Sequence, residues 1–187
     1  MTYYGSKELA DSFRTVRKNT LAIAEEIPEQ SYNFQPAPGT HTVGQTLVHI
    51  AVSPRVAEQI HFVERRTTLE GFDFFGVRGG LIAELQTPRS KADIIELLRT
   101  SGDKFAGLLE SASEEFLGQT ITYPQGMTPA SKSRFEMLLG TKEHEMHHRG
   151  QLMLVERMLG IVPHLTRDMQ ARIASMEAAA KTAQASR

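Results

Sequence analysis

Apolar residues recur at steps of three and four through most of the chain, which is the spacing that places them on one face of an α-helix. Pro28 ends the first such run, Pro54 interrupts the second, and Gly160 followed by Pro163 ends the last. Four helices are therefore predicted, over residues 7–26, 42–66, 90–110 and 131–160. Helices of this length, joined by long connections, predict an all-α fold, a four-helix bundle.

The segments outside these helices differ in composition. Residues 67–89 are rich in glycine and phenylalanine ("GFDFFGVRGG") and show no long period, so they predict a lengthy connection with a short helix around Leu81. Residues 163–187 are alanine-rich and predict an extension that is helical at first and frays toward its end. No strand pattern competes with the helices. The expected organisation is one bundle domain over residues 1–162 and a partly helical C-terminal extension over residues 163–187.

Composition narrows the classes of partner. The chain has 187 residues, of which 40% are hydrophobic and 23% charged, which is enough for one substantial core. The net charge of −1 gives no electrostatic reason to bind nucleic acid or anionic lipid. No apolar run is long enough to span a bilayer, and the N-terminus lacks the apolar segment of a signal peptide, so we expect a soluble, cytoplasmic protein. Because the chain has no cysteine, any transition-metal ligand must be histidine, aspartate or glutamate.

Histidines are concentrated in the stretch "EHEMHHRGQL", residues 143–152. His144 and His148 are four residues apart, a spacing that puts two side chains about 40° apart around a helix and about 6 Å apart along it. Both imidazoles therefore point the same way and can share one ion. His49, in "TLVHIAV", faces the bundle interior by the same periodicity and is the best candidate for a third ligand. The alternative for each is a hydrogen-bonded core histidine without a metal.

Several other side chains are candidates for supporting roles. Gln151 shares the direction of the histidine pair and could orient a ligand or a bound water, whereas His147 points away from the pair and is a neighbour of it rather than a ligand. Glu145 is the nearest carboxylate in sequence and a weak candidate for a catalytic base; the alternative is an exposed helical charge. The remaining histidines are expected to be solvent-facing or hydrogen-bonded structural residues, namely His41, His61 and His164.

His144-Glu145-x-x-His148 also matches the motif of the zincin metalloproteases. The extended metzincin pattern requires glycine and histidine where this chain has Gln151 and Leu154, and a gluzincin requires a glutamate on a separate downstream helix. Peptidases of this kind align their substrate along a strand edge, which the predicted fold lacks. The pattern therefore does not favour a zincin protease.

A different family accounts for more of the chain. The letters HxxxHRGQ at residues 144–151, together with the upstream "IPEQSYNFQPAPGTHTVGQTLVHIA", resemble the DinB superfamily, the DinB/YfiT-like metalloenzymes. The resemblance covers about residues 5–162 and consists of two separated motifs in the right order. The chain departs from the commonest pattern in having no tryptophan, with Phe34 in the loop where an aromatic is usual, and in its Phe/Gly insertion and its tail.

The resemblance implies an up-down-down-up bundle in which His49, His144 and His148 hold a divalent metal. It also implies a homodimer, for which the phenylalanines of "GFDFFGV" are a candidate surface unless they cover the monomer's own core. Members with a known role are mostly thiol-linked isomerases and S-transferases that use mycothiol, bacillithiol or glutathione. A small thiol is therefore a candidate cosubstrate.

Three neutral histidines leave coordination positions open, which suits chemistry better than a closed structural site. The expected function is a divalent-metal-dependent enzyme acting on a small molecule, with Ni, Zn or Fe as the ion and S-transfer or hydrolysis as the reaction. Metal affinity is expected to fall as the pH drops through the ordinary histidine range of about 6 to 7. The alternative is a non-catalytic, stress-related protein that binds metal and a ligand without turning the ligand over.

Overall fold

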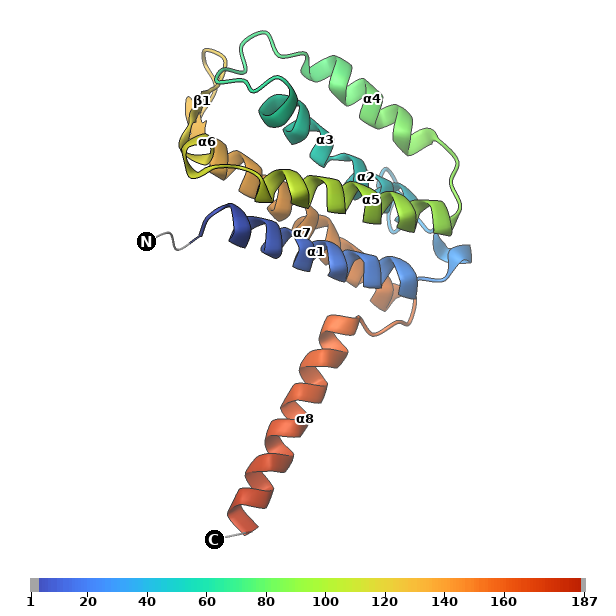
Figure 1. Cartoon of the computed structure of the whole chain (residues 1–187). Coiled ribbons are helices and arrows are strands. Elements are labelled where there is room, and N and C mark those ends of the chain that lie inside the picture. The colour runs from blue at the N-terminus through green and yellow to red at the C-terminus, as the bar shows by residue number, and fades with distance from the viewer. Residues whose placement is uncertain (1–3, 186–187) are drawn as a thin grey trace.

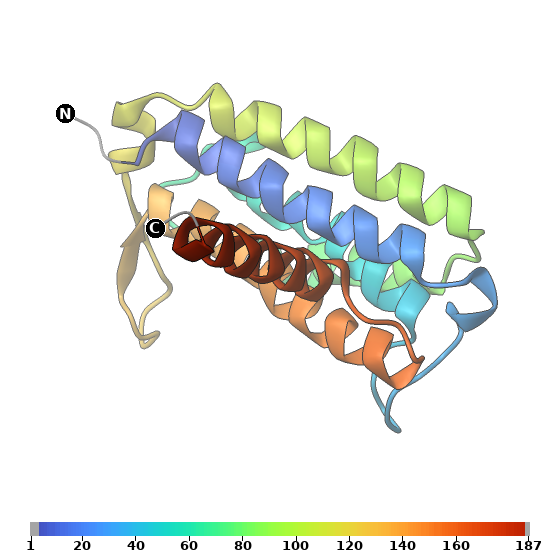
Figure 2. The same ribbon diagram turned by 90° about the horizontal axis from the view of Figure 1, so that it is seen from below.

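The computed structural model describes residues 4–185 and confirms the all-α four-helix bundle (Figure 1). The bundle consists of α1 (Ser6–Glu26), α2 (Val43–Val52), α5 (Lys91–Glu110) and α7 (Arg134–Met158). Helices α1 and α2 each pack against both α5 and α7, so the four enclose one core. The chain runs one way along α1, returns along α2 and again along α5, and runs back along α7, which is the up-down-down-up order (Figures 1 and 2).

Capping residues begin three of the four bundle helices where the sequence predicts starts. In each case a serine or threonine side chain accepts a hydrogen bond from a backbone N–H three residues on, and the side chain at that position bonds back. The pairs are Thr42–Gln45, Ser90–Asp93 and Ser133–Glu136. After α7 the chain turns at Gly160, whose φ of 79° suits a residue without a Cβ.

The second predicted helix, residues 42–66, is divided into three parts. Pro54 begins α3 (Pro54–Ala57), and the π-helical segment η2 (Glu58–Val63) follows directly. Pro54 has no N–H with which to continue α2, so the predicted interruption of the second helix at this position is confirmed. A single turn of 3₁₀ helix, η1 (Glu29–Ser31), lies in the loop between α1 and α2.

The connection between the second and third bundle helices is more regular than predicted. It contains a helix of 13 residues, α4 (Phe74–Gln86), where the sequence predicts only a short helix around Leu81. Asp73 caps α4 by accepting a hydrogen bond from the backbone N–H of Gly76. None of the residues of α4 is buried, which is why no strong apolar stripe marks it. Because α2 and α5 run in the same direction, the chain must cross back along the bundle, and α4 makes this crossing on the outside (Figure 1).

The phenylalanines of "GFDFFGV" have different environments. Phe72 is 8% exposed and packs in a cluster with Ile60 and Ile121, so for this residue the prediction that it covers the monomer's core is confirmed. Phe74 is 42% exposed and Phe75 is 86% exposed. The three side chains therefore do not form one shared surface.

The prediction that the chain has no strand is wrong. β1 (Thr120–Thr122) and β2 (Ser131–Ser133) pair in antiparallel fashion, with Ile121 opposite Lys132. They follow the short helix α6 (Glu114–Gly118) and precede α7. Ile121 is the fully buried residue of the pair, and one apolar position in three residues is too short a pattern to show the alternation of a strand.

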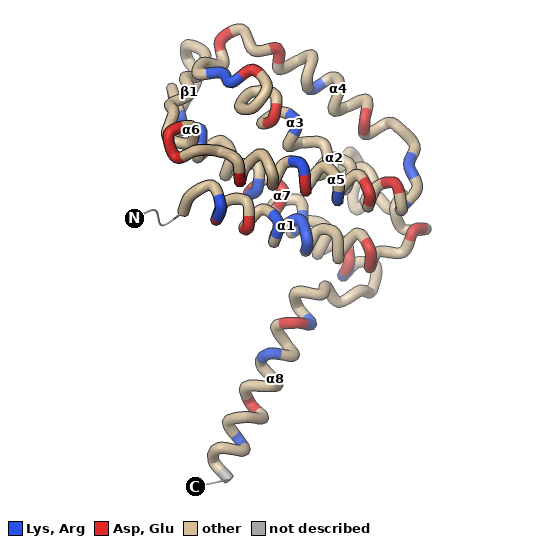
Figure 3. Tube along the Cα trace, viewed as in Figure 1, with Lys and Arg blue, Asp and Glu red and all other residues tan. Residues whose placement is uncertain are grey.

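The C-terminal extension is a continuous helix, α8 (His164–Ala185), which projects away from the bundle (Figure 1). Charged residues of both signs are spread along it, as they are over the bundle helices (Figure 3). Apolar side chains are exposed between them: Met169 at 57%, Ile173 at 48% and Met176 at 72%. Among the described residues, no helix combines the length and apolarity needed to cross a membrane. The division of the chain at residue 162 stays a prediction.

Candidate metal centre

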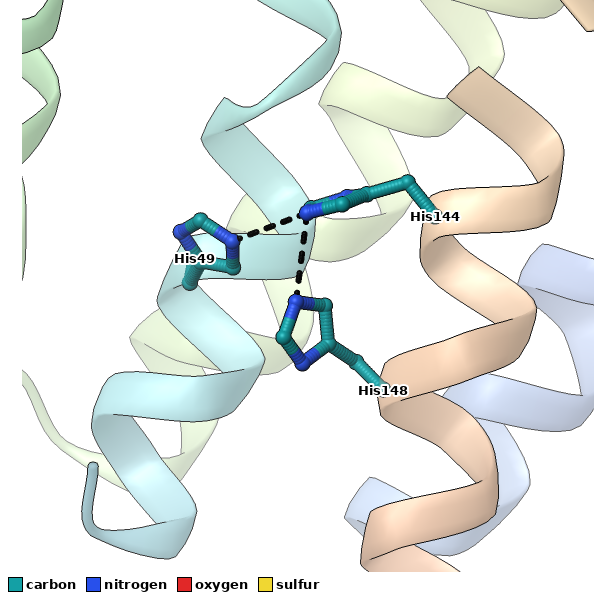
Figure 4. Close-up of side chains that lie close together, drawn as sticks. All are labelled: His49, His144 and His148. Atoms are coloured by element: carbon teal, nitrogen blue, oxygen red, sulfur yellow. Dashed lines mark hydrogen bonds between the residues drawn. The ribbon is translucent and has the colours of Figure 1, made fainter. Parts of the chain in front are cut away.

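Three histidines from two helices converge between α2 and α7 (Figure 4). His49 projects from α2, and His144 and His148 project from successive turns of α7. Nε2 of His144 lies 3.2 Å from Nε2 of His49 and 3.2 Å from Nε2 of His148. The candidate ligand atoms all lie within 4.8 Å of one another. The structure thus brings together the three residues that the sequence predicts as ligands.

The separations of these nitrogens fit a shared ion. Zinc binds imidazole nitrogen at about 2.0–2.1 Å, and tetrahedral angles at that bond length place two ligand atoms about 3.3 Å apart. The two Nε2–Nε2 distances of 3.2 Å are close to this value. Imidazole ligands suit nickel, zinc and iron alike. The three residues could therefore hold one divalent ion without rearrangement of the helices.

Burial keeps the three imidazoles in the neutral form that binds metal. It lowers the pKa of His49 to about 4, and the neighbouring rings of His148 and His144 add to the effect. Burial also lowers the pKa of His144. For His148, burial lowers the pKa against the opposing effect of a hydrogen bond to Gln151. Each ring therefore offers a lone pair at neutral pH.

Gln151 and His147 form a hydrogen-bonded chain behind His148. Nδ1 of His148 lies 2.8 Å from Oε1 of Gln151, and Nε2 of Gln151 lies 3.1 Å from Nε2 of His147. An amide oxygen can only accept, so Nδ1 of His148 donates, and its Nε2 keeps the lone pair that faces the other histidines. Gln151 thus occupies the orienting position expected from its place on the helix, and His147 stands behind it.

Ser53 also touches the cluster, although sequence reasoning did not select it. Its Oγ lies 3.4 Å from Nε2 of His49 and donates a hydrogen bond of 2.6 Å to the backbone carbonyl of the same residue. The signal that could have identified it is its position four residues after His49, which places both side chains on one side of the helix.

Glu145 points away from the histidines. It is 2% exposed, so the prediction of an exposed helical charge is wrong. Nε and Nη2 of Arg17 each donate to its carboxylate at 2.9 Å, and Oγ1 of Thr20 donates at 2.8 Å. Both partners of Glu145 lie on α1, whereas His144 and His148, on the same helix as Glu145, face His49 on α2. A carboxylate held by three donors on the α1 side has a structural role, and its weak candidacy as a catalytic base has no geometric support.

The remaining histidines lie outside the cluster. His61 is 1% exposed, and its Nδ1 accepts a hydrogen bond of 2.9 Å from Nη1 of the buried Arg134, so it is a hydrogen-bonded structural residue as predicted. His41 is exposed, with its ring centroid 5.9 Å from that of His49. His164 begins α8, with Nε2 3.4 Å from Oδ1 of Asn19.

Two cavities flank the histidine cluster. One of about 430 Å³ is bordered by His49 and His144, and the other, of about 490 Å³, by His148 and Gln151. Most of the other residues around both are apolar. Sites for small molecules in proteins usually enclose about 300–1,000 Å³. A small molecule could therefore reach the cluster from either side.

Comparison with known proteins identifies the family of the chain. The family model of the DinB superfamily matches residues 12–152. The chain belongs to the DinB superfamily. Helix α8 lies beyond the residues matched by the family model.

Two proteins of Bacillus subtilis illustrate the relationship. The uncharacterized protein YjoA of strain 168 is 23% identical over 157 residues, which span 83% of this chain and 91% of YjoA. The crystal structure of YjoA, a DinB-like protein, covers 82% of this chain and 92% of its own with a TM-score of 0.59. YfiT, described as "a probable metal-dependent hydrolase with an unusual four-helix bundle topology", is 13% identical, covers 86% of this chain and 91% of its own, and has a TM-score of 0.62. At these identities the two structures show a shared fold.

Proposed function

We propose that this DinB superfamily protein is a metal-dependent enzyme acting on a small molecule, with His49, His144 and His148 as the ligands of one divalent ion. The observation that carries the proposal is the convergence of three neutral imidazoles beside two cavities. Three protein ligands leave room for a substrate, whereas structural zinc sites use four. The likeness of the fold to that of YfiT, which is described as a metal-dependent hydrolase, agrees with this function.

The bound ion, Gln151 and the cavity walls would have different roles in the reaction. A divalent ion supplies Lewis acidity, which makes a coordinated water or thiol easier to deprotonate near neutral pH. Gln151 holds the ring of His148 with its Nε2 turned toward the other two histidines. The mostly apolar walls of the two cavities suit the apolar part of a substrate.

Hydrolysis is the first candidate reaction, because it is the activity ascribed to YfiT. S-transfer with a small thiol cosubstrate is the second, and the presence of two separate cavities beside the histidines favours it, since they would give two substrates separate places. A non-catalytic, stress-related ligand-binding protein would bind the same ion without turnover. Reconstitution with Ni, Zn or Fe, each alone, distinguishes the candidate ions by the rate each one supports.

Metal-loaded protein is expected to turn over neutral esters or amides, or to join electrophiles to a small thiol, while the His144→Ala variant falls to the background rate. His144 lies between the other two histidines, so its loss removes the nitrogen closest to both. Rates are compared at equal protein concentration, with His164→Ala as a control that removes a histidine outside the cluster. Equal rates for wild type and His144→Ala with every substrate and thiol would contradict the proposed enzyme and favour the non-catalytic ligand-binding protein.

We further propose that the chain forms a homodimer through α8. The exposed Met169, Ile173 and Met176 follow one another at steps of four and three, which is the spacing of a coiled-coil core. If two copies of α8 pair in parallel, Arg172 of one copy faces Glu177 of the other at the edge of that core. The second copy thus supplies both the apolar surface and the opposite charge.

Analytical ultracentrifugation tests the dimer. Ile173→Glu is expected to give the 20.8 kDa monomer, and Arg172→Glu to weaken the dimer, because each places like charges together in the paired helices. Exchanging the charges in the double variant Arg172→Glu with Glu177→Arg should restore it. Ala174→Glu, on the outer side of the helix, is the control. If the wild-type protein sediments as a monomer at micromolar concentration, the proposed homodimer is wrong.

A further inference from the structure

The cavity of about 430 Å³ beside His49 and His144 has an uncharged wall. Apolar side chains of α3, η2 and α7 line it, among them Val56, Ile60 and Met137. Among the described residues that line it, none is an aspartate, glutamate, lysine or arginine. A charged group placed among these apolar side chains, away from the histidines, would lose part of its water without gaining a counter-charge.

His61, which also lines this cavity, does not change that conclusion. Its Nδ1 accepts a hydrogen bond from Arg134, and a nitrogen that accepts carries no proton. Burial, with the nearby charge of Arg134, lowers the pKa of His61 to about 4. The ring is therefore neutral, and it stands between the cavity and the guanidinium.

Helix α4 borders the cavity on the outside of the bundle (Figure 1). Phe74 and Leu81 both line the cavity, and because they are seven residues apart on a helix they lie on nearly the same side of it. The helix is held at two points. Phe74 stacks edge-on against the core residue Phe72, with ring centroids 4.6 Å apart, and an ion pair joins Glu84 to Arg55 of α3. Helix α4 thus holds the apolar side chains of Phe74 and Leu81 in a fixed position at the cavity beside the histidines.

We propose that this cavity binds the uncharged, apolar part of the substrate, and that Phe74 and Leu81 determine how long that part can be. The group selected by this cavity is an alkyl or aryl group, such as that of an ester, and not a carboxylate or phosphate. The inference rests on the proposed function, since it takes the molecule bound here to be the one that reaches the three histidines. Leu81 and Phe74 are then specificity-determining residues on an element outside the bundle.

Displacement of a neutral, apolar fluorescent dye from the metal-free protein tests the chemical class. Short straight-chain methyl esters are expected to displace the dye with an affinity that rises about fourfold per methylene until the chain fills the cavity. Carboxylates of equal chain length are expected to bind at least about tenfold more weakly. Equal affinity for esters and carboxylates would overturn the assignment of an uncharged ligand.

Variants of α4 test the role of the helix. In Leu81→Ala and in Phe74→Ala, affinity is expected to keep rising up to a longer ester chain than in wild type. Leu81→Arg is expected to bring carboxylates to the affinity of esters. Two exposed residues of the same helix serve as controls: Phe75→Ala for Phe74→Ala, and Ile82→Arg for Leu81→Arg, since Phe75 is 86% and Ile82 46% exposed. If Ile82→Arg has the same effect as Leu81→Arg, the change reflects surface charge and the proposal fails.

The same assay tests whether the ligand binds instead in the second cavity, beside His148 and Gln151. Leu154 lines that cavity, so Leu154→Arg is expected to leave the preference of wild type for esters unchanged. If Leu154→Arg changes this preference and Leu81→Arg does not, the ligand binds in the second cavity and the proposal is wrong. The dye-displacement assay uses metal-free protein, so a negative result in it does not contradict the proposed metal-dependent activity. Conversely, if no activity is found, the affinities for esters and carboxylates can still be measured.

Discussion

Replacing Arg17 with methionine is expected to lower the free energy of unfolding by about 3–5 kcal/mol, because it leaves the carboxylate of Glu145 buried without its counter-charge. Arg17 is 4% exposed and Glu145 is 2% exposed, so water cannot solvate the remaining charge in the folded state. Nε and Nη2 of Arg17 both donate to the carboxylate, which makes the pair bidentate as well as buried.

Arg17 contacts every other helix of the bundle. From α1 it donates to Glu145 on α7, to the carbonyl of Leu98 on α5 at 2.5 Å, and to the carbonyl of Ile50 on α2 at 3.4 Å. Ile50 follows His49 in the chain, and Glu145 follows His144. The same side chain therefore ties together the two helices that carry the histidines, and Arg17→Met is also expected to weaken metal binding.

Urea unfolding of metal-free protein measures the expected loss in the free energy of unfolding. The double variant Arg17→Met with Glu145→Met is expected to recover much of the lost stability, because it removes both charges and keeps similar volume. Lys7→Met serves as the control: Lys7 pairs with Asp11 at the surface, where the side chains are 72% and 49% exposed, so a change of less than about 1 kcal/mol is expected. A loss below about 1 kcal/mol in Arg17→Met would contradict the role given to the buried pair.

The bundle and the histidine cluster could be predicted because their signals are local. Capping pairs such as Thr42–Gln45 mark helix starts within four residues, and the four-residue spacing of His144 and His148 fixes their common direction. Helix α4 (Phe74–Gln86) gave a weaker signal, because a helix on the outside of the bundle buries no stripe and needs none.

The environment of Glu145 could not be predicted from its own helix. Its partner Arg17 is 128 residues away in sequence, and periodicity along α7 cannot show what lies on α1. A trace of the contact is present in α5, where Gly102 stands in the middle of a helix. A Cβ there would lie 2.8 Å from Cγ and from Nη1 of Arg17, so the glycine makes room for the guanidinium.

His148→Ala is expected to abolish stoichiometric metal binding, because two imidazoles on different helices are left where three converge. Elemental analysis after dialysis measures the bound ion, and circular dichroism establishes that the variant is folded. His147→Ala is the matched control. It removes the acceptor of Gln151 and leaves the three ligands, so affinity is expected to fall by about 10–100-fold without loss of the site. A folded His148→Ala variant that keeps a full equivalent of metal would show that the assignment is wrong.

The pH at which wild-type protein releases its metal is expected to lie below the ordinary histidine range. Protons and the ion compete for the same Nε2 lone pairs, so affinity falls once the pH drops below the pKa values of the folded site. Burial lowers the pKa of all three ligands, and that of His49 to about 4. The structure therefore moves the window expected from sequence, about 6 to 7, to lower values. Competition with a chelator, measured stepwise from about pH 8 to about pH 4, should place the fall in intrinsic affinity below the ordinary histidine range of about 6 to 7. Half-release between about pH 6 and 7 would mean that the rings titrate as exposed imidazoles do, and would contradict a site that holds them neutral before the ion arrives.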